Sequence, residues 1–172
     1  EAAYDLLRRD AKPDSRRSLW LFVRHEKFDT NEEMPAGYTA SAWVCVGGTQ
    51  NGSNITLTSG EEATCTITNI DDTPTLKLVK LVTNDDGGSA VANDWDLTAT
   101  GTSRTFTELT PAAADASFND VTAGVQYTLT ETAAPTGYTN GTTWSCTGTG
   151  ISASDATHVT VALGGAVTCT IT

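Results

Sequence analysis

A motif that occurs twice constrains this chain more than any other feature. Residues 35–69 begin with Pro-Ala-Gly-Tyr, continue through Trp-Val-Cys and end in Thr-Cys-Thr-Ile-Thr-Asn. Residues 135–172 begin with Pro-Thr-Gly-Tyr, continue through Trp-Ser-Cys and end in Thr-Cys-Thr-Ile-Thr. Self-similarity of this kind indicates a tandem array of small domains. Such arrays usually hold other domains at a distance, position them or adhere to a surface, so we expect a structural protein.

Length and charge exclude several classes of protein. The 172 residues leave room for one medium domain or two small ones. The formal net charge of −11 argues against a nucleic-acid partner, because nucleic acids attract basic surfaces. No apolar run approaches the roughly 18–20 residues of a membrane span. The chain begins at Glu1 without a signal-peptide pattern, which we interpret as a mature or excised fragment.

Short alternating segments after residue 74 predict β-structure. Apolar and polar residues alternate there, and Gly, Pro, Asn and Asp separate the segments. We therefore predict an all-β chain of tandem prealbumin-like (Ig-like) β-sandwich domains, the first atypical or incomplete. The strands are expected over residues 76–81, 95–100, 103–109, 117–121, 126–131, 144–147, 158–162 and 167–172.

The domain boundary is predicted at residues 71–74, where an acidic pair and a proline interrupt strand pairing. Residues 75–172 then form a complete second repeat and residues 34–70 a partial first repeat. Residues 1–33 stand apart, because they hold seven of the ten basic residues. This segment is a divergent half-domain, a reading-frame artefact or a strand donor, with a possible helix over 1–9 and a strand over 19–23.

The four cysteines occupy matched places in the two copies. Cys45 and Cys65 correspond to Cys146 and Cys169, and neither pair has the Cys-x-x-Cys spacing of zinc or redox sites. We predict two disulfides within domains and hence an oxidising, extracellular setting; the alternative is four reduced, buried cysteines. Each bridge would stabilise its domain by about 3 kcal/mol. In both copies a tryptophan two residues before the first cysteine lies on the same strand face and is expected to cover the bridge.

One segment resembles a known family. Residues 127–138 read Tyr-Thr-Leu-Thr-Glu-Thr-Ala-Ala-Pro-Thr-Gly-Tyr, and residues 76–80 read Leu-Lys-Leu-Val-Lys. Both are similar to segments of the Cna protein B-type, or SpaA-like, prealbumin-like domain of bacterial surface adhesins and pilins. The resemblance implies an extracellular module, on the cell surface or secreted, that serves as a structural stalk, adhesin or filament unit. Its partners would be neighbouring repeats, identical subunits, or a host surface protein or glycan.

The resemblance also implies an isopeptide site. Many family members join a lysine to an asparagine within the core, since burial favours a neutral, nucleophilic amine and a proton-donating carboxylic acid. By position the lysine is Lys77, with Lys80 as second choice, and the acid is Glu131. The acceptor is expected just beyond Thr172, because Asn69 follows the same sequence in the first copy. The two lysines face opposite sides of a regular strand, so at most one points inward; the alternative is two solvated lysines.

Acidic turns suggest a possible cation site. Asp71, Asp72, Asp85 and Asp86 would offer carboxylate oxygens to calcium. The alternative interpretation is that these turns are merely solvated. No other cofactor or metal is expected.

Two other functions remain open besides the structural one. A carbohydrate- or host-protein-binding module would expose aromatic loop residues such as Trp95 and Tyr138. A self-assembling filament would use residues 1–33 to donate or receive a strand. An enzyme is not expected, because the sequence shows no Ser/His/Asp, paired-carboxylate or metal-ligand constellation.

Overall fold

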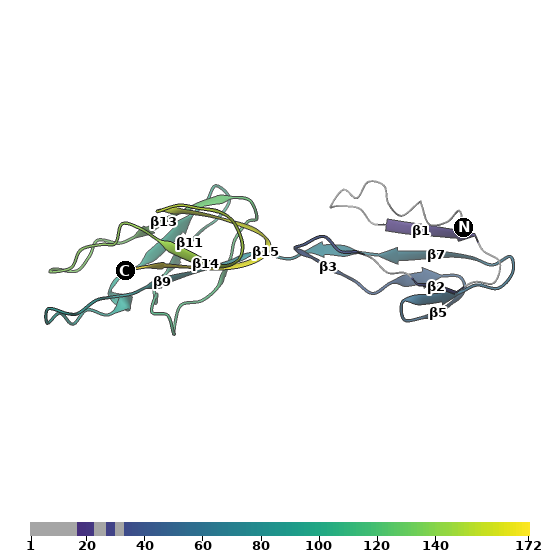
Figure 1. Cartoon of the computed structure of the whole chain (residues 1–172), viewed down its shortest axis with the longest axis horizontal. Coiled ribbons are helices and arrows are strands. Elements are labelled where there is room, and N and C mark those ends of the chain that lie inside the picture. The colour runs from purple at the N-terminus through teal and green to yellow at the C-terminus, as the bar shows by residue number, and fades with distance from the viewer. Residues whose placement is uncertain (1–16, 23–26, 30–32) are drawn as a thin grey trace. The chain divides into compact units, whose positions relative to one another are not determined.

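The computed structural model describes residues 17–22, 27–29 and 33–172 and is all-β, as predicted. Among these residues the helical structure is a single 3-10 turn, η1 (Ala92–Asp94). The chain divides into two units, residues 1–71 and 72–172, which are described separately (Figure 1). Within the described residues no helix has the length and apolar character needed to cross a bilayer.

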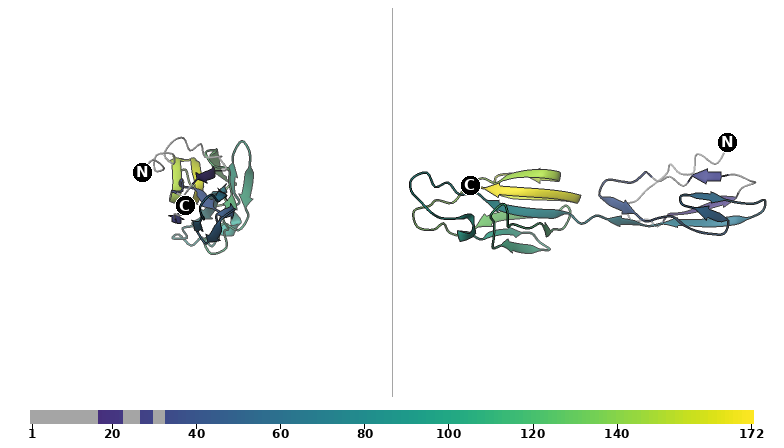
Figure 2. Two further views of the ribbon diagram at one scale, coloured as in Figure 1. Left: turned by 90° about the vertical axis from the view of Figure 1, so that its right-hand side faces the viewer. Right: turned by 90° about the horizontal axis from the view of Figure 1, so that it is seen from below.

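Unit 2 contains one seven-stranded sheet in the order β11-β10-β13-β15-β9-β12, with β14 paired to β15. Neighbouring strands run antiparallel except β9 and β15, which are parallel. The sheet curls into a sandwich whose layers are seen in Figure 2. Its strands are β9 (Thr75–Lys80), β10 (Leu97–Thr100), β11 (Thr105–Glu108), β12 (Asn119–Asp120), β13 (Gln126–Glu131), β14 (Ser145–Ser154) and β15 (His158–Ile171).

Period-two alternation builds the core of unit 2. On β13, Tyr127 and Leu129 are buried while the threonines beside them are exposed, because successive side chains on a strand point to opposite faces. The same rule places three alternate residues near the end of β15 in the core. The core also contains the buried side chains of Leu76, Leu78, Leu97, Ala99, Val121, Trp144, Val159, Val161, Val167, Cys169 and Ile171.

The last strand is longer than the sequence predicts. Residues 158–162 and 167–172 are expected to be separate strands, but β15 runs continuously from His158 to Ile171. Gly164 has φ +65°, and the pairing with β14 shifts register around Thr149 and Ile151. The Gly-Gly pair therefore produces an irregularity within the strand, because glycine accommodates positive φ without a steric penalty.

Unit 1 is smaller and its strands fall into three sheets, β1-β7-β4, β2-β6-β5 and β3-β8. Its buried core cluster contains only Ile55, Leu57, Ala63 and Cys65 among the described residues. That the first repeat is atypical or incomplete stays a prediction. Its strands are β1 (Arg17–Phe22), β2 (Lys27–Asp29), β3 (Tyr38–Ala40), β4 (Val44–Val46), β5 (Thr49–Asn51), β6 (Asn54–Thr56), β7 (Glu62–Ile67) and β8 (Asn69–Asp71).

The neighbour of β7 marks the main difference between the repeats. The strand β1 pairs with β7 in antiparallel fashion, whereas β9 pairs with the corresponding part of β15 in parallel. The strand expected over residues 19–23 thus corresponds to β1. The helix expected over residues 1–9 lies outside the described residues.

Candidate functional site

A buried ion pair is the most distinctive polar feature of unit 2. The Nζ of Lys80 lies 2.8 Å from Oε2 of Glu131, and their side chains are 2% and 4% exposed. The two residues end β9 and β13, strands that do not pair with each other. Instead, β13 pairs with residues 158–160 of β15 and β9 with residues 166–171. The ion pair therefore connects two parts of the sandwich through its interior.

The surroundings of this pair are aromatic. The Nζ of Lys80 lies 4.9 Å from the ring centroid of Trp95, a favourable cation–π distance. Trp95 is itself 1% exposed. Oε2 of Glu131 is held by the ion pair, whereas its buried Oε1 has no hydrogen-bond partner among the described residues. Glu131 therefore retains acceptor capacity in a place where water is excluded.

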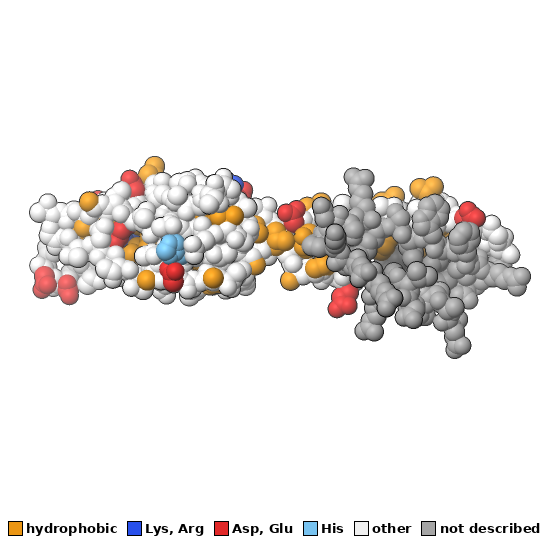
Figure 3. All heavy atoms as spheres, turned by 90° about the horizontal axis from the view of Figure 1, so that it is seen from above, with side chains coloured by type: hydrophobic (Ala, Val, Ile, Leu, Met, Phe, Trp, Pro, Cys, Tyr) orange, Lys and Arg blue, Asp and Glu red, His pale blue; other side chains and the backbone are white. Residues whose placement is uncertain are grey.

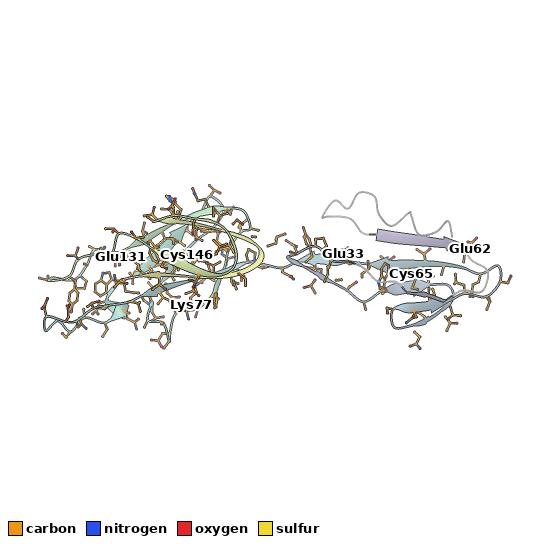
Figure 4. The ribbon with its side chains drawn as sticks, viewed as in Figure 1. Glu33, Glu62, Cys65, Lys77, Glu131 and Cys146 are labelled. Atoms are coloured by element: carbon orange, nitrogen blue, oxygen red, sulfur yellow. A yellow bond between two sulfur atoms is a disulfide. The ribbon has the colours of Figure 1, made fainter. Side chains whose placement is uncertain are left out.

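The structure pairs Glu131 with Lys80 and not with Lys77, the lysine that the sequence analysis placed first. The Nζ of Lys77 instead donates a hydrogen bond to the carbonyl of Ala113 at 3.0 Å and lies 5.9 Å from the ring centroid of Phe118. Figure 4 shows Lys77 and Glu131 well apart. The expectation that only one lysine points inward is confirmed, because Lys77 is half-buried and Lys80 is buried.

The sequence contains a signal that the Lys80 side chain points into the core. Lys80 has the same parity along the strand as Leu76 and Leu78, which lie in the core. By the period-two rule it belongs to their face. No local pattern predicts that Trp95 lies beside Lys80, because Trp95 comes from a different segment of the chain.

Both predicted disulfides are present. Cys45 bonds Cys65 between β4 and β7, and Cys146 bonds Cys169 between β14 and β15. In each case the two cysteines are direct partners across the sheet, with Cα atoms 4.0 Å apart. Trp144 belongs to the same buried cluster as Cys169, and Trp43 packs against the cluster that contains Cys65; that each tryptophan covers its bridge stays a prediction.

The comparison with known families agrees with this geometry. A family model described as "SpaA_2: Prealbumin-like fold domain" matches residues 21–67 and 71–171. The chain belongs to this SpaA-type, prealbumin-like family. No curated protein and no solved structure matches it. The family model thus recognises both repeats, and in each SpaA-type repeat the match includes both cysteines.

A pocket of about 530 Å³ opens at the end of the SpaA-type unit 2 where β9 and β15 finish. Its lining includes Lys80 and Trp95, the loop of residues 81–88, residues 136–139 and Thr172. The Oη of Tyr138 donates to Oδ1 of Asn84 at 2.5 Å and accepts from the amide of Ala90 at 3.0 Å. These bonds fix one wall of the pocket.

The aromatic residues named for a binding function are not free on the surface. Trp95 is buried, and its Nε1 donates to Oδ1 of Asn140 at 3.2 Å. The Tyr138 ring contacts it edge-on at 5.7 Å between centroids. Both side chains therefore build the domain, which gives no support to a binding site made from them.

The predicted calcium ligands belong to different elements of the two units. Asp71 lies on β8, Asp72 opens unit 2, and Asp85 and Asp86 line the pocket of unit 2. Among the described residues, no group of three or more His, Cys, Asp or Glu side chains is arranged to hold a metal ion. Calcium binding remains a prediction.

The surface of the described residues is acidic. Figure 3 shows scattered acidic side chains and very few lysines or arginines on the face drawn. Hydrogen bonds hold two of these carboxylates in place. The amide of Thr157, followed by the His158 side chain, lowers the pKa of Asp155. The amide and hydroxyl of Thr58 likewise lower the pKa of Glu61.

Proposed function

We propose that this chain is a force-bearing module of an extracellular bacterial surface protein, such as a stalk, an adhesin or a filament. The observation that carries this proposal is the parallel pairing of the first and last strands of unit 2. β9 and β15 are in register from Thr75 opposite Ala166 to Lys80 opposite Ile171. The chain enters unit 2 at one end of this ladder and reaches Thr172 at the other.

This arrangement resists tension because the load acts along the strands. When the two ends are pulled, β9 and β15 slide past each other and their hydrogen bonds must break together. Two further bonds support the ends of the ladder: the amide of Gly164 donates to the carbonyl of Asp72, and the amide of Leu81 donates to that of Ile171, both at 2.8 Å. A strand peeled from its neighbour would lose its bonds one at a time and yield at lower force.

The disulfide of unit 2 limits what tension can release. The bond between Cys146 and Cys169 keeps residues 147–168 in a closed loop even if the ladder yields. A cross-link of this kind also stabilises the folded state by about 3 kcal/mol in the chain-entropy model. Extracellular proteins favour such bonds because their surroundings are oxidising.

Single-molecule stretching of the full chain tests this function. Unit 2 should yield in one high-force step, and reduction should lengthen that step by about 80 Å, given the 23-residue separation of the cysteines and roughly 3.5 Å per extended residue. Gradual unfolding at low force, with the disulfide intact, would contradict the proposal.

The same unit supports a proposal for the isopeptide chemistry, with Lys80 as the nucleophile and Glu131 as the proton carrier. Ile171 pairs with Lys80, and a residue two positions beyond it would share its inward face. Lys80 would give a proton to Glu131, and its neutral nitrogen would attack the side-chain carbonyl carbon of an asparagine at that position. The new C–N bond would form as the old one breaks. Glu131 would pass its proton to the departing nitrogen, and the second proton that the lysine nitrogen loses would go to the same nitrogen, so that ammonium leaves and Glu131 is again a carboxylate.

Mass spectrometry tests this chemistry directly. An asparagine appended after Thr172 should lower the intact mass by about 17 Da relative to the calculated value, through the loss of ammonia. Lys80→Met in the extended chain should restore the full mass, whereas Lys77→Met should not. An unchanged mass in the extended chain would contradict the assignment.

A filament remains a second candidate because of an exposed strand in unit 1. β4 is the last strand of the sheet β1-β7-β4, and its Val44 and Val46 side chains are 63% and 75% exposed. Apolar edge strands promote pairing between chains. Light scattering at increasing concentration should reveal association that Val46→Lys abolishes. A monomer at all concentrations would exclude this candidate.

A further inference from the structure

The sequence contains two asparagines that are followed by glycine, Asn51 before Gly52 and Asn140 before Gly141. Glycine has no side chain, so its backbone nitrogen can approach the side-chain carbonyl of the preceding asparagine without steric hindrance. A serine follows the first pair and a threonine the second. Because the local sequences are so similar, a difference in reactivity between the two pairs must come from the fold.

The first pair lies at the tip of a hairpin in unit 1. Asn51 ends β5 and is paired with Asn54 at the start of β6, which leaves Gly52 and Ser53 as a two-residue loop. The Asn51 side chain is exposed and makes no hydrogen bond in the described structure. Gly52 has φ +62°, and a Cβ atom placed on it would meet nothing within 4 Å. The space around this pair is therefore open.

The backbone nitrogen of Gly52 is equally accessible. Among the described residues its amide donates to no acceptor. The Nε2 of Gln50 donates to the carbonyl oxygen of Gly52 at 2.9 Å and to that of Trp43 at 2.7 Å. These bonds hold the peptide group that follows Gly52, whereas a reaction between the two residues requires movement of the peptide group that precedes it. Both reacting groups of the pair are thus free to approach each other in water.

The second pair is held on both sides. Oδ1 of Asn140 accepts a hydrogen bond from Nε1 of Trp95 at 3.2 Å, and its Nδ2 donates to the carbonyl of Thr132 at 2.7 Å. A Cβ atom placed on Gly141 would lie 2.5 Å from Cγ1 of Ile171, a core residue that is 2% exposed. Ring closure between Asn140 and Gly141 would have to break both hydrogen bonds and move backbone that packs against the core.

We propose that Asn51 is a site of spontaneous modification, which converts it to aspartate and isoaspartate, and that the fold protects Asn140 from the same reaction. The nitrogen of Gly52 attacks Cγ of Asn51 and gives up its proton. The new C–N bond closes a succinimide ring as the bond from Cγ to Nδ2 breaks, and Nδ2 takes up the proton and leaves as ammonia. Water then opens the ring at either of its two carbonyl carbons.

The modification would change unit 1 and leave unit 2 as it is. Both products place a new negative charge at the tip of the hairpin. The isoaspartyl product also adds one carbon to the main chain at Asn51, where β5 is paired with β6. The register of the hairpin cannot absorb this extra atom, so the pairing is disturbed at its tip. This inference concerns a different unit from the force-bearing ladder and does not depend on that role.

The experiment follows both asparagines in one sample. The folded full chain, with its disulfides intact, is kept in mildly alkaline buffer for several weeks and then digested at acidic pH, where ring closure is slow. In mass spectrometry the peptide that contains Asn51 should gain about 1 Da and separate into two products. Conversion at Asn51 should be about tenfold or more faster than at Asn140, because Asn140 reacts only after local opening.

The matched control is the reduced and alkylated chain in guanidinium chloride, in which the two asparagines should convert at similar rates. Asn51→Gln should remove the early mass gain from its peptide, since glutamine would have to close a larger ring. Equal rates in the folded chain, faster conversion at Asn140, or an unmodified Asn51 would overturn the proposal. The same preference for Asn51 in guanidinium chloride would also overturn it, because local sequence and not the fold would then set the rates.

Discussion

Lys80 and Glu131 form an ion pair with their charged atoms 2.8 Å apart, although their strands never pair. Both side chains are almost fully buried. A buried charge is unfavourable unless a partner compensates it. The pair therefore links the two halves of the sandwich and makes each residue dependent on the other.

Glu131→Gln should lower the free energy of unfolding of unit 2 by about 3–5 kcal/mol, because it leaves the Lys80 charge unpaired in the core. Lys80→Met should lower the free energy of unfolding by a similar amount, because it leaves the Glu131 carboxylate unpaired in the core. Urea unfolding of the full chain, followed by tryptophan fluorescence, measures both changes.

The matched control is Lys77→Met on the same strand. Its ammonium group is half-exposed and makes no buried ion pair among the described residues, so its loss should change stability by less than about 1 kcal/mol. The double variant Lys80→Met with Glu131→Leu should recover much of the stability. A double variant as unstable as the two single variants combined would refute the coupling.

Reduction should affect unit 1 before unit 2. The bond between Cys45 and Cys65 joins β4 to β7, which pair at three positions, whereas the bond between Cys146 and Cys169 joins β14 to β15, which pair at eight, so the first bond supplies a larger share of what holds its two strands together. Limited proteolysis with and without reductant should show cleavage in residues 33–71 at reductant concentrations that leave residues 75–172 intact. Simultaneous cleavage of both units would argue against this order.

The stability of the folded chain should fall at acidic pH. The folded-state pKa of Asp155 lies below its ordinary value of 3.8, and that of Glu61 below 4.5. Groups with lowered pKa stabilise the fold above the unfolded value, and this contribution is lost as the pH falls through the folded value. The contribution of these two groups to the melting temperature should therefore be nearly constant above about pH 5 and should decline below that pH.

Asp155→Asn tests the source of this decline, because asparagine keeps a hydrogen-bond acceptor but does not titrate in this range. The variant should melt with a shallower pH dependence below about pH 5. Asp86→Asn, in the exposed pocket loop, is the control. Identical pH profiles for Asp155→Asn and the parent chain would contradict the assignment.

Tyr138→Phe should loosen the loop that it holds. The substitution removes the hydrogen bonds of Oη with Asn84 and with the amide of Ala90. Loss of such bonds lowers stability by about 1 kcal/mol. Hydrogen exchange should quicken at Ala90 and leave the β9–β15 ladder unchanged; unaltered exchange at Ala90 would show that other contacts hold the loop.

Local sequence features predicted much of this molecule. The duplicated motif identified both disulfide partners, and alternation predicted the strands on which Leu76, Leu78 and Leu129 lie in the core. The same rule places Lys80 and not Lys77 on the inward face, whereas positional similarity to the family put Lys77 first and Lys80 second as the isopeptide lysine; the structure pairs Glu131 with Lys80. The local alternation of residues therefore indicates which side chains of the strand point inward.

The remaining features depend on pairing between distant segments, which local pattern does not encode. The parallel match of β9 with β15 joins residues about ninety positions apart in register. The Tyr138–Asn84 bond spans 54 positions. The Gly-Gly pair in β15 has the composition of a turn, yet β14 pairs on both sides of it and keeps the strand continuous.

The direction of pulling tests the force-bearing claim most directly. Handles at Asp72 and Thr172 load the β9–β15 ladder along its length, whereas handles at Asp72 and Gly164, which are joined by a hydrogen bond at one end of the ladder, peel the strands apart. We expect the first geometry to require a several-fold higher rupture force than the second. Equal forces in both directions would contradict the account.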